Sequence, residues 1–328
     1  MRTLVTGGAG FIGSHLTDFL LEKGHSVLVI DNLCGGWMKN LKDAEKKPLF
    51  RFVHADVRDK GVLNGLFEGI DWVFHLAALA DIVPSIEKPR DYFETNVDGT
   101  FNVLEEAKKA NVKRFLYAAS SSCYGIPSQY PTPETASACP QYPYALTKYL
   151  GEQLVMHWAK IYNFPALSLR LFNVFGPRSR TTGVYGAVFG VFLAQKLNGK
   201  PFTIVGDGNQ TRDFTFVADV VDAFYSAAKS DLTGEFMNVG SGGHYSINRL
   251  VDLLGGPKIH IPKRPGEPDC TFAAITKIHQ KLGWKSKIPF QEGVHQILTR
   301  IEEFRDAPVW DPDSIQKATQ SWFRYLNK

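Results

Sequence analysis

A tyrosine and a lysine, Tyr144 and Lys148, stand four residues apart in the stretch CPQYPYALTKYLGE. Residues at this spacing share one face of a helix, so the phenol and the ammonium can meet. A phenol has an unperturbed pKa of about 10, and an adjacent ammonium favours its charged form. The pair can therefore act as a base near neutral pH. It would take the proton of an alcohol as hydride leaves the same carbon.

Three consecutive serines, Ser120, Ser121 and Ser122, precede the tyrosine, and the first of them lies 24 residues before it. They follow the strand-like run RFLYAA, and hydroxyls at a strand end can reach a substrate oxygen beside the tyrosine. Three serines in a row are also compatible with an ordinary turn. We expect at least one of them to be catalytic, and we interpret His75 in FHLAA as a hydrogen-bonded strand residue.

A glycine cluster lies at the start of the chain, where Gly8, Gly10 and Gly13 follow the spacing G-x-G-x-x-G and Gly7 allows the related G-x-x-G-x-x-G. Missing Cβ atoms permit a tight turn and the close approach of a pyrophosphate to a helix N-terminus. Asp31 ends the next strand-like run, 18 residues after Gly13, where an acid binds the adenosine ribose. Asp31 could instead cap a turn. No arginine stands beside it, which favours NAD over NADP.

Alternating strand-like and helical segments must position these groups. Strand-like runs end near Asp31, Asp56, Ala77 and Ser120, and amphipathic stretches such as NVDGTFNVLEEAKKA separate them. This alternation predicts an α/β fold with a doubly wound, mostly parallel Rossmann sheet and a smaller C-terminal α/β lobe. Ligands of such a sheet bind at the carboxyl ends of its strands.

The composition suits a small anionic ligand better than nucleic acid. The chain has 328 residues, a formal charge of +4 and dispersed lysines and arginines. Its four cysteines form no C-x-x-C pair, so neither a metal site nor a disulfide framework is indicated. No basic leader precedes the first strand-like run, and no apolar run approaches the ~18 residues of a membrane span. We expect a cytoplasmic protein that binds neither membrane nor nucleic acid.

The glycine cluster, Asp31, HLAA, SSSCYG, YPYALTK and GDGNQTRDFTFVADV occur here in one order. Together they resemble the extended short-chain dehydrogenase/reductase family, specifically its nucleotide-sugar epimerases and dehydratases, from Met1 to about Gly293. The resemblance implies NAD as the cofactor, Tyr144 as the base, and Ser120 as the catalytic hydroxyl with Ser121 beside it. The implied cofactor-binding residues are Gly7, Gly10, Phe11, Ile12, Gly13, Asp31, Asn32, Asp56, Val57, Leu76, Ala77, Ala78, Asn96, Tyr144 and Lys148.

The same resemblance implies a nucleotide diphosphate sugar as substrate, most of all a UDP-sugar. Asn173, Arg212 and Arg264 match positions that contact the diphosphate, and guanidiniums suit such a dianion. Glu267 matches a position that contacts the uridine ribose, and Thr271 one beside the C2 group of the sugar. The implied substrate-binding residues are Ser120, Ser121, Ser122, Tyr144, Asn173, Arg180, Arg212, Arg264, Glu267 and Thr271.

The residues after Ser120 bear on the reaction. Dehydratases and decarboxylases of the family carry acids there, whereas Ser121 and Ser122 do not ionise near neutral pH. This favours C4 epimerisation of UDP-N-acetylhexosamine or UDP-hexose through a transient 4-keto sugar. Arg180 lies near the position where uronate-specific relatives hold a carboxylate, so a UDP-hexuronate 4-epimerase is the competing hypothesis. A dehydratase, decarboxylase or reductase and a non-catalytic NAD-binding regulator are less favoured.

We expect the Rossmann domain to comprise residues 1–173 and about 212–243, and the nucleotide-sugar lobe about 174–211 and 244–328. Residues 306–328 suggest no function. Relatives often dimerise through the helix of residues 96–109 and the helix of Tyr144, and the periodic Leu150, Leu154 and Trp158 are compatible with a homodimer.

Overall fold

The computed structural model describes residues 1–179 and 187–327. Seven strands form a central sheet in the order β11-β6-β5-β4-β1-β2-β3, and all neighbouring strands are parallel. This confirms the predicted doubly wound sheet. The strands are β1 (Arg2–Thr6), β2 (Ser26–Asp31), β3 (Phe50–His54), β4 (Trp72–His75), β5 (Arg114–Ser120), β6 (Ala166–Leu171) and β11 (Glu235–Val239).

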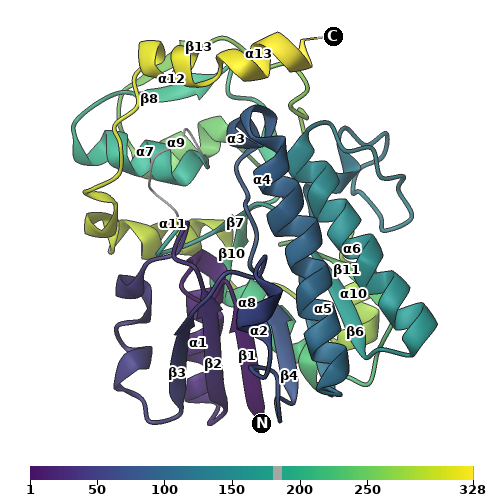
Figure 1. Cartoon of the computed structure of the whole chain (residues 1–328). Helices are drawn as coiled ribbons and strands as arrows, with labels where there is room; N and C mark the ends of the chain where they lie inside the picture. Colours follow the sequence, from purple (N-terminus) through teal and green to yellow (C-terminus); the bar gives the residue numbers. More distant parts are fainter. Residues whose placement is uncertain (180–186, 328) are drawn as a thin grey trace.

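Helices cover both faces of this sheet (Figure 1). One face packs against α1 (Phe11–Glu22), α8 (Val217–Lys229) and α10 (Thr276–Leu282). The other packs against α5 (Gly99–Lys109) and α6 (Pro143–Tyr162). Parallel strands buried on both faces need continuous apolar runs, as in the segment LV of β1 and VLVI of β2. The strand order reverses between β1 and β4, where a ligand crevice is expected.

A smaller lobe lies beyond the carboxyl ends of these strands (Figure 1). Its core is aromatic, with Phe175 stacked on Phe189 and Phe214 stacked on Phe290. Its elements are α7 (Val188–Leu197), β8 (Phe202–Val205), α9 (Ile247–Leu254), β13 (Lys258–Ile261), α11 (Phe290–Leu298), η5 (Ile301–Phe304), α12 (Pro312–Ala318) and α13 (Gln320–Leu326).

Between the segments of this lobe, the chain returns to the sheet through α8 and β11, which pairs with β6. The exact division of the chain into two domains stays a prediction. The remaining elements are η1 (Met38–Leu41), η2 (Ala44–Lys46), α2 (Lys60–Leu63), α3 (Ile82–Glu87), α4 (Pro89–Phe93), η3 (Glu94–Asp98), η4 (Ser121–Tyr124), β7 (Val174–Phe175), β9 (Thr211–Arg212), β10 (Thr215–Phe216) and β12 (Tyr245–Ser246).

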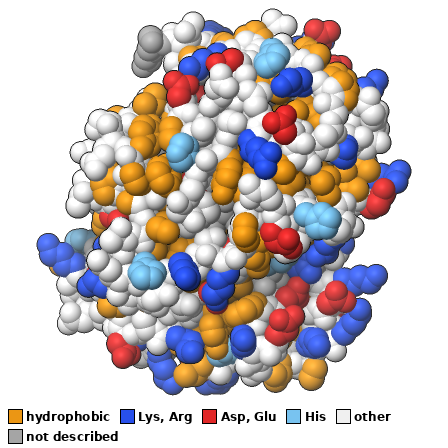
Figure 2. All heavy atoms as spheres, turned by 180° about the vertical axis from the view of Figure 1, so that it is seen from behind, with side chains coloured by type: hydrophobic (Ala, Val, Ile, Leu, Met, Phe, Trp, Pro, Cys, Tyr) orange, Lys and Arg blue, Asp and Glu red, His pale blue; other side chains and the backbone are white. Residues whose placement is uncertain are grey.

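The surface in Figure 2 shows lysines and arginines dispersed among acidic, hydrophobic and neutral side chains. Within residues 1–179 and 187–327, no helix combines the length and hydropathy that a bilayer crossing requires. The expected location in the cytoplasm stays a prediction.

Candidate active site

A cavity of about 570 Å³ lies between the sheet and the smaller lobe. The ends of β4 and β5, the start of α6 and the loop before α10 contribute to its wall. Many side chains predicted from the sequence meet here. Those lining the cavity are Phe11, Ile12, Leu76, Ala78, Ser120, Ser121, Ser122, Tyr144, Lys148, Asn173, Arg212, Arg264, Glu267 and Thr271.

Tyr144 lies in the first turn of α6, whose first residue is Pro143. Proline is favoured at this position because its fixed φ suits a helix and its missing N–H would have no helical partner. Burial raises the pKa of the Tyr144 phenol. The hydroxyl of Ser120, within hydrogen-bonding reach, opposes this rise, and the negative charge of Asp81 adds to it. The phenol is therefore protonated in the ligand-free chain at neutral pH.

Lys148 follows one turn later on α6 and is 4% exposed. Its Nζ lies 4.3 Å from the centre of the Tyr117 ring. Burial lowers the pKa of Lys148 to about 7, although the charge of Glu152 favours the ammonium. Burial is the largest influence on the pKa of the Tyr144 phenol, and the lysine lies over the Tyr117 ring, so the expectation that Lys148 lowers the pKa of Tyr144 stays a prediction.

The serine cluster forms a turn at the cavity wall, and its catalytic role stays a prediction. Ser120 ends β5 and caps η4, and its Oγ accepts a hydrogen bond from the Ser122 backbone N–H at 3.2 Å. The hydroxyls of Ser120 and Ser122 lie 2.8 Å apart. All three serines also line the cavity. The turn therefore presents hydroxyls beside Tyr144.

The glycine loop after β1 has the shape that a pyrophosphate requires. Gly7 has φ +71°, and a Cβ on Gly13 would lie 2.2 Å from the carbonyl oxygen of Gly7. The next helix, α1, begins after Gly10 without a side-chain cap, so backbone N–H groups and the helix dipole are directed to the loop. These residues fit NAD.

The predicted adenosine side of the cofactor site lies at the ends of β2 and β3. The buried Asp31 carboxylate accepts hydrogen bonds from the backbone N–H groups of Ala9 at 2.9 Å and Leu33 at 2.7 Å. It thus holds the glycine loop and a turn, as the alternative hypothesis expects. Asn32 donates to Asp56 at 2.8 Å, so these two predicted contacts lie together.

Three other predicted cofactor residues have neighbours that define structural roles. Asn96 is 1% exposed, donates to the Leu79 carbonyl at 3.0 Å and to Thr147 at 3.0 Å, and so holds a cavity loop against α6. Val57 belongs to the hydrophobic core. The backbone of Ala77 lies directly against Gly7. Contact of these residues with NAD stays a prediction.

Five of the predicted substrate residues form two groups, one of three residues and one of two. Glu267 lies 2.8 Å from Arg212 and 3.9 Å from Arg264, so one carboxylate contacts both guanidiniums. Thr271 donates to the Asn173 side-chain oxygen at 2.6 Å. The two arginines and the carboxylate lie in the same cavity as the tyrosine. Their contacts with a diphosphate and a ribose stay predictions, and Arg180 lies outside the described residues.

Asp81, Tyr142 and Trp322 also line the cavity and were not predicted from the sequence. Tyr142 stacks on Tyr144 with ring centres 6.3 Å apart and planes inclined by 10°. Its position two residues before Tyr144 is the one local signal that could have identified it. Trp322 comes from the C-terminal helix, and no motif marks it.

His75 is a structural residue, as predicted. Its ring nitrogens lie 2.7 Å from the Thr6 hydroxyl and 2.9 Å from the Thr100 hydroxyl. Burial lowers its pKa to about 3, so it is neutral under ordinary conditions. Among the described residues, no three His, Cys, Asp or Glu side chains are grouped to hold a metal ion.

Comparisons with known proteins agree with this geometry. The family model described as "NAD dependent epimerase/dehydratase family" matches residues 3–240. The UDP-glucose 4-epimerase of Mycolicibacterium smegmatis is 37% identical over 93% of this chain and 99% of its own length. UDP-glucuronic acid decarboxylase 2 of Arabidopsis thaliana is 34% identical over 95% of this chain and 70% of its own.

A solved structure is similar over the whole fold. UDP-glucuronic acid 4-epimerase from Bacillus cereus, in complex with UDP-glucuronic acid and NAD, has a TM-score of 0.84 and 32% identity. The match covers 92% of this chain and 99% of that protein.

Proposed function

Because the chain belongs to the NAD-dependent epimerase/dehydratase family, we propose that it is a UDP-sugar 4-epimerase that uses NAD. The observation that carries this proposal is the meeting of Tyr144, Lys148 and Ser120 in one cavity with a cluster of arginines. Ser121 and Ser122 supply hydroxyls at the positions where an elimination would need an acid. The site therefore favours proton and hydride exchange at one carbon.

Each residue then has a defined task. NAD, held by the glycine loop, would supply the hydride acceptor for C4, and the 4-keto sugar would take the hydride back on its opposite face. Tyr144 takes the proton of the C4 hydroxyl and gives it back, while Ser120 donates a hydrogen bond toward the same oxygen. Burial keeps the phenol protonated before ligands bind, so the positive charge of Lys148 and of the nicotinamide must favour the phenolate in the complex. Arg212 and Arg264 hold the diphosphate.

Two residues, Thr271 and Arg180, bear on which UDP-sugar is the substrate. Thr271, a small side chain on the cavity wall, leaves room beside the C2 group and supports UDP-N-acetylhexosamine or UDP-hexose. A UDP-hexuronate is the competing substrate, because Arg180 suits a carboxylate and the Bacillus cereus neighbour binds UDP-glucuronic acid. Arg180→Ala should lose activity on uronates alone if that candidate is right.

The decisive experiment incubates the purified protein with UDP-glucose, UDP-N-acetylglucosamine and UDP-glucuronic acid without added reductant. Nuclear magnetic resonance of the products should show a C4 epimer of at least one sugar. Tyr144→Phe should lower kcat by about 10²–10⁴, the range of general-base catalysis, while the protein keeps its NAD. A dehydrated, decarboxylated or net-oxidised product would refute the epimerase.

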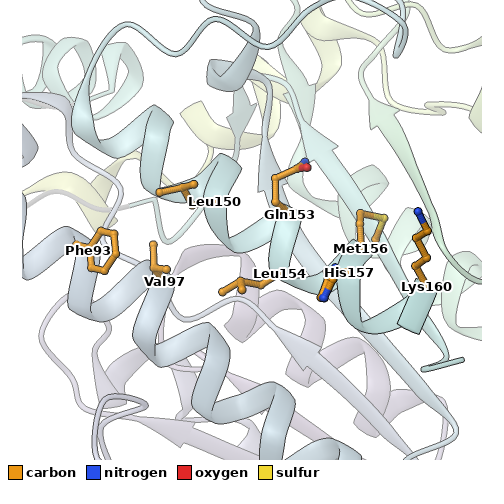
Figure 3. Close-up of a pocket in the computed structure, with 8 residues that line it drawn as sticks. All are labelled: Phe93, Val97, Leu150, Gln153, Leu154, Met156, His157 and Lys160. Carbon is orange, nitrogen blue, oxygen red and sulfur yellow. The ribbon is translucent and has the colours of Figure 1, made fainter. Parts of the chain in front are cut away.

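We further infer that the protein is a homodimer. An apolar surface groove lies between α6 and the neighbouring segment of α4 and η3 (Figure 3). Phe93 and Val97 face it from one side, and Leu150 and Leu154 from α6. Trp158 instead packs inside the chain against Phe101 at 5.4 Å, so it is not part of the proposed interface.

A second copy placing its own α6 in this groove would bury these apolar side chains. Sedimentation should give twice the mass of the chain, and Leu154→Arg should shift the protein toward the monomer. A wild-type protein that sediments as a monomer at micromolar concentration would exclude the dimer.

A further inference from the structure

The C-terminal segment, which suggested no function from its sequence, reaches the proposed active site. Helices α12 and α13 lie at the top of the smaller lobe, with α13 against α3 (Figure 1). From α13, Trp322 is 4% exposed and contributes to the wall of the same cavity as Tyr144 and Arg264.

Trp322 is tied to the loop that carries the predicted diphosphate-binding residues. Its indole Nε1–H donates to the carbonyl oxygen of Pro265 at 2.7 Å. The guanidinium of Arg264 lies 5.4 Å from the centre of its ring, within the range of a cation–π contact. Leu326, one turn later, lies close to Gly266 in the same loop. The helix therefore fixes the place of Arg264.

Trp322 also approaches the catalytic tyrosine. Its ring centre lies 6.4 Å from that of Tyr142, with the planes inclined by 47°. Tyr142 in turn stacks on Tyr144. The three rings form a continuous aromatic series from the reacting phenol to the arginine loop.

Helices α12 and α13 are held in position by contacts outside the cavity. Ser321 donates to Glu87 of α3 at 2.8 Å. The carbonyl of Trp310 accepts from the Gln195 side chain of α7 at 2.7 Å, and Asp311 caps α12 by accepting from the Ser314 N–H at 2.8 Å. These contacts hold Trp322 at the cavity wall.

We propose that α13 is part of the substrate site, with Trp322 contacting the hexose ring and positioning Arg264. This inference rests on the proposed function. In a UDP-sugar, the diphosphate is attached at C1 of the hexose, and the carbon that reacts is C4 of the same ring. A hexose with its diphosphate at Arg264 and its C4 at Tyr144 therefore lies between these residues, where Trp322 and Tyr142 are. The apolar C–H face of a hexose packs well on an aromatic ring of this kind.

Titration calorimetry of the NAD-loaded protein with UDP and with the UDP-sugar that it epimerises tests the proposal. Trp322→Ala should weaken UDP-sugar binding by about tenfold or more, since a cation–π contact, a buried hydrogen bond and the ring contact are all lost. UDP, which lacks the hexose, should lose less affinity. Trp322→Phe keeps a ring and should lose about threefold.

Tyr325→Ala is the matched control, because Tyr325 lies on the same helix and is 52% exposed. It should bind both ligands as the wild type does. Tryptophan fluorescence gives a second measurement if Trp322→Ala does not fold. The UDP-sugar should quench the wild type more than Trp322→Phe.

Equal UDP-sugar affinity in Trp322→Phe and the wild type, together with equal quenching, would overturn the proposal. So would an equal loss for UDP and UDP-sugar in Trp322→Ala, because that result leaves no contact with the hexose. A wild-type protein that binds neither ligand would refute the proposed function itself, and with it this inference.

Discussion

Lys148 places its Nζ 4.3 Å from the centre of the Tyr117 ring, and the Tyr117 hydroxyl donates to the backbone carbonyl of Lys148 at 3.3 Å. Tyr117 is fully buried in β5. The ring therefore packs against α6 and provides a negative π face for a cation that burial disfavours. This contact holds Lys148 at the cavity wall.

Tyr117→Leu should lower kcat by about tenfold. It should also move the pH dependence of kcat that reports Lys148 to lower pH. A cation–π contact stabilises the ammonium, so its loss lowers the pKa of Lys148 further. Tyr117→Phe keeps the ring face and should stay within about threefold of wild-type kcat. Steady-state kinetics between pH 5 and 9 would measure both. Identical profiles for the two variants would show that the ring face does not affect the lysine.

Residues close in sequence were the ones that could be predicted. The helix of Tyr144 and Lys148 and the turn of Gly7 to Gly13 follow from local spacing, and the sheet follows from the strand and helix alternation. The packing of Lys148 on Tyr117 and of Trp322 on Tyr142 joins distant segments, and neither leaves a periodic signal. The pKa of Tyr144 also depends on burial, which the spacing of two residues cannot reveal.

Substitutions in the glycine loop should have graded effects on cofactor binding. A Cβ at Gly13 would lie 2.2 Å from the Gly7 carbonyl oxygen, whereas a Cβ at Gly10 would lie 3.1 Å from it. Gly13→Ala should therefore purify with little NAD, and Gly10→Ala should retain most of it. Absorbance of the nucleotide released on denaturation gives the NAD content. Equal NAD content in both variants would contradict a steric cause.

Lys148→Met should stabilise the NAD-free protein while it abolishes activity. The pKa of Lys148 is about 7 in the folded chain and near 10.5 when unfolded, so the folded state disfavours the proton. The free-energy cost of burying the Lys148 ammonium is therefore present in full below pH 7, and it falls as pH rises toward 10.5. The variant should gain about 1–3 kcal/mol at pH 6, and this gain should shrink toward pH 10.

Urea unfolding at pH 6, 8 and 10 would measure the free energies. Lys229→Met is a suitable control, since Lys229 lies at the end of α8, away from the cavity wall. A gain that does not change with pH would mean that packing, and not the buried charge, sets the difference.

A buried ion pair connects α6, the helix of Tyr144 and Lys148, to the sheet. Arg170 of β6 lies 2.5 Å from Glu152 of α6, and the two side chains are 4% and 1% exposed. Ser168 donates to the same carboxylate at 2.9 Å. Glu152→Ala should cost about 3–5 kcal/mol of unfolding free energy, because it leaves the Arg170 charge buried without its partner. Asp222→Ala, which breaks the exposed pair with Lys287, should cost less than about 1 kcal/mol.

The double variant Glu152→Leu with Arg170→Met separates stability from catalysis. Two apolar side chains of similar size remove both charges, so the unfolding free energy should return to within about 2 kcal/mol of the wild type. The charge of Glu152 favours the ammonium of Lys148, and this support stays absent in the double variant. Its kcat should therefore fall at higher pH as Lys148 loses its proton more easily. A stable double variant with the wild-type pH profile would show that Glu152 serves folding alone.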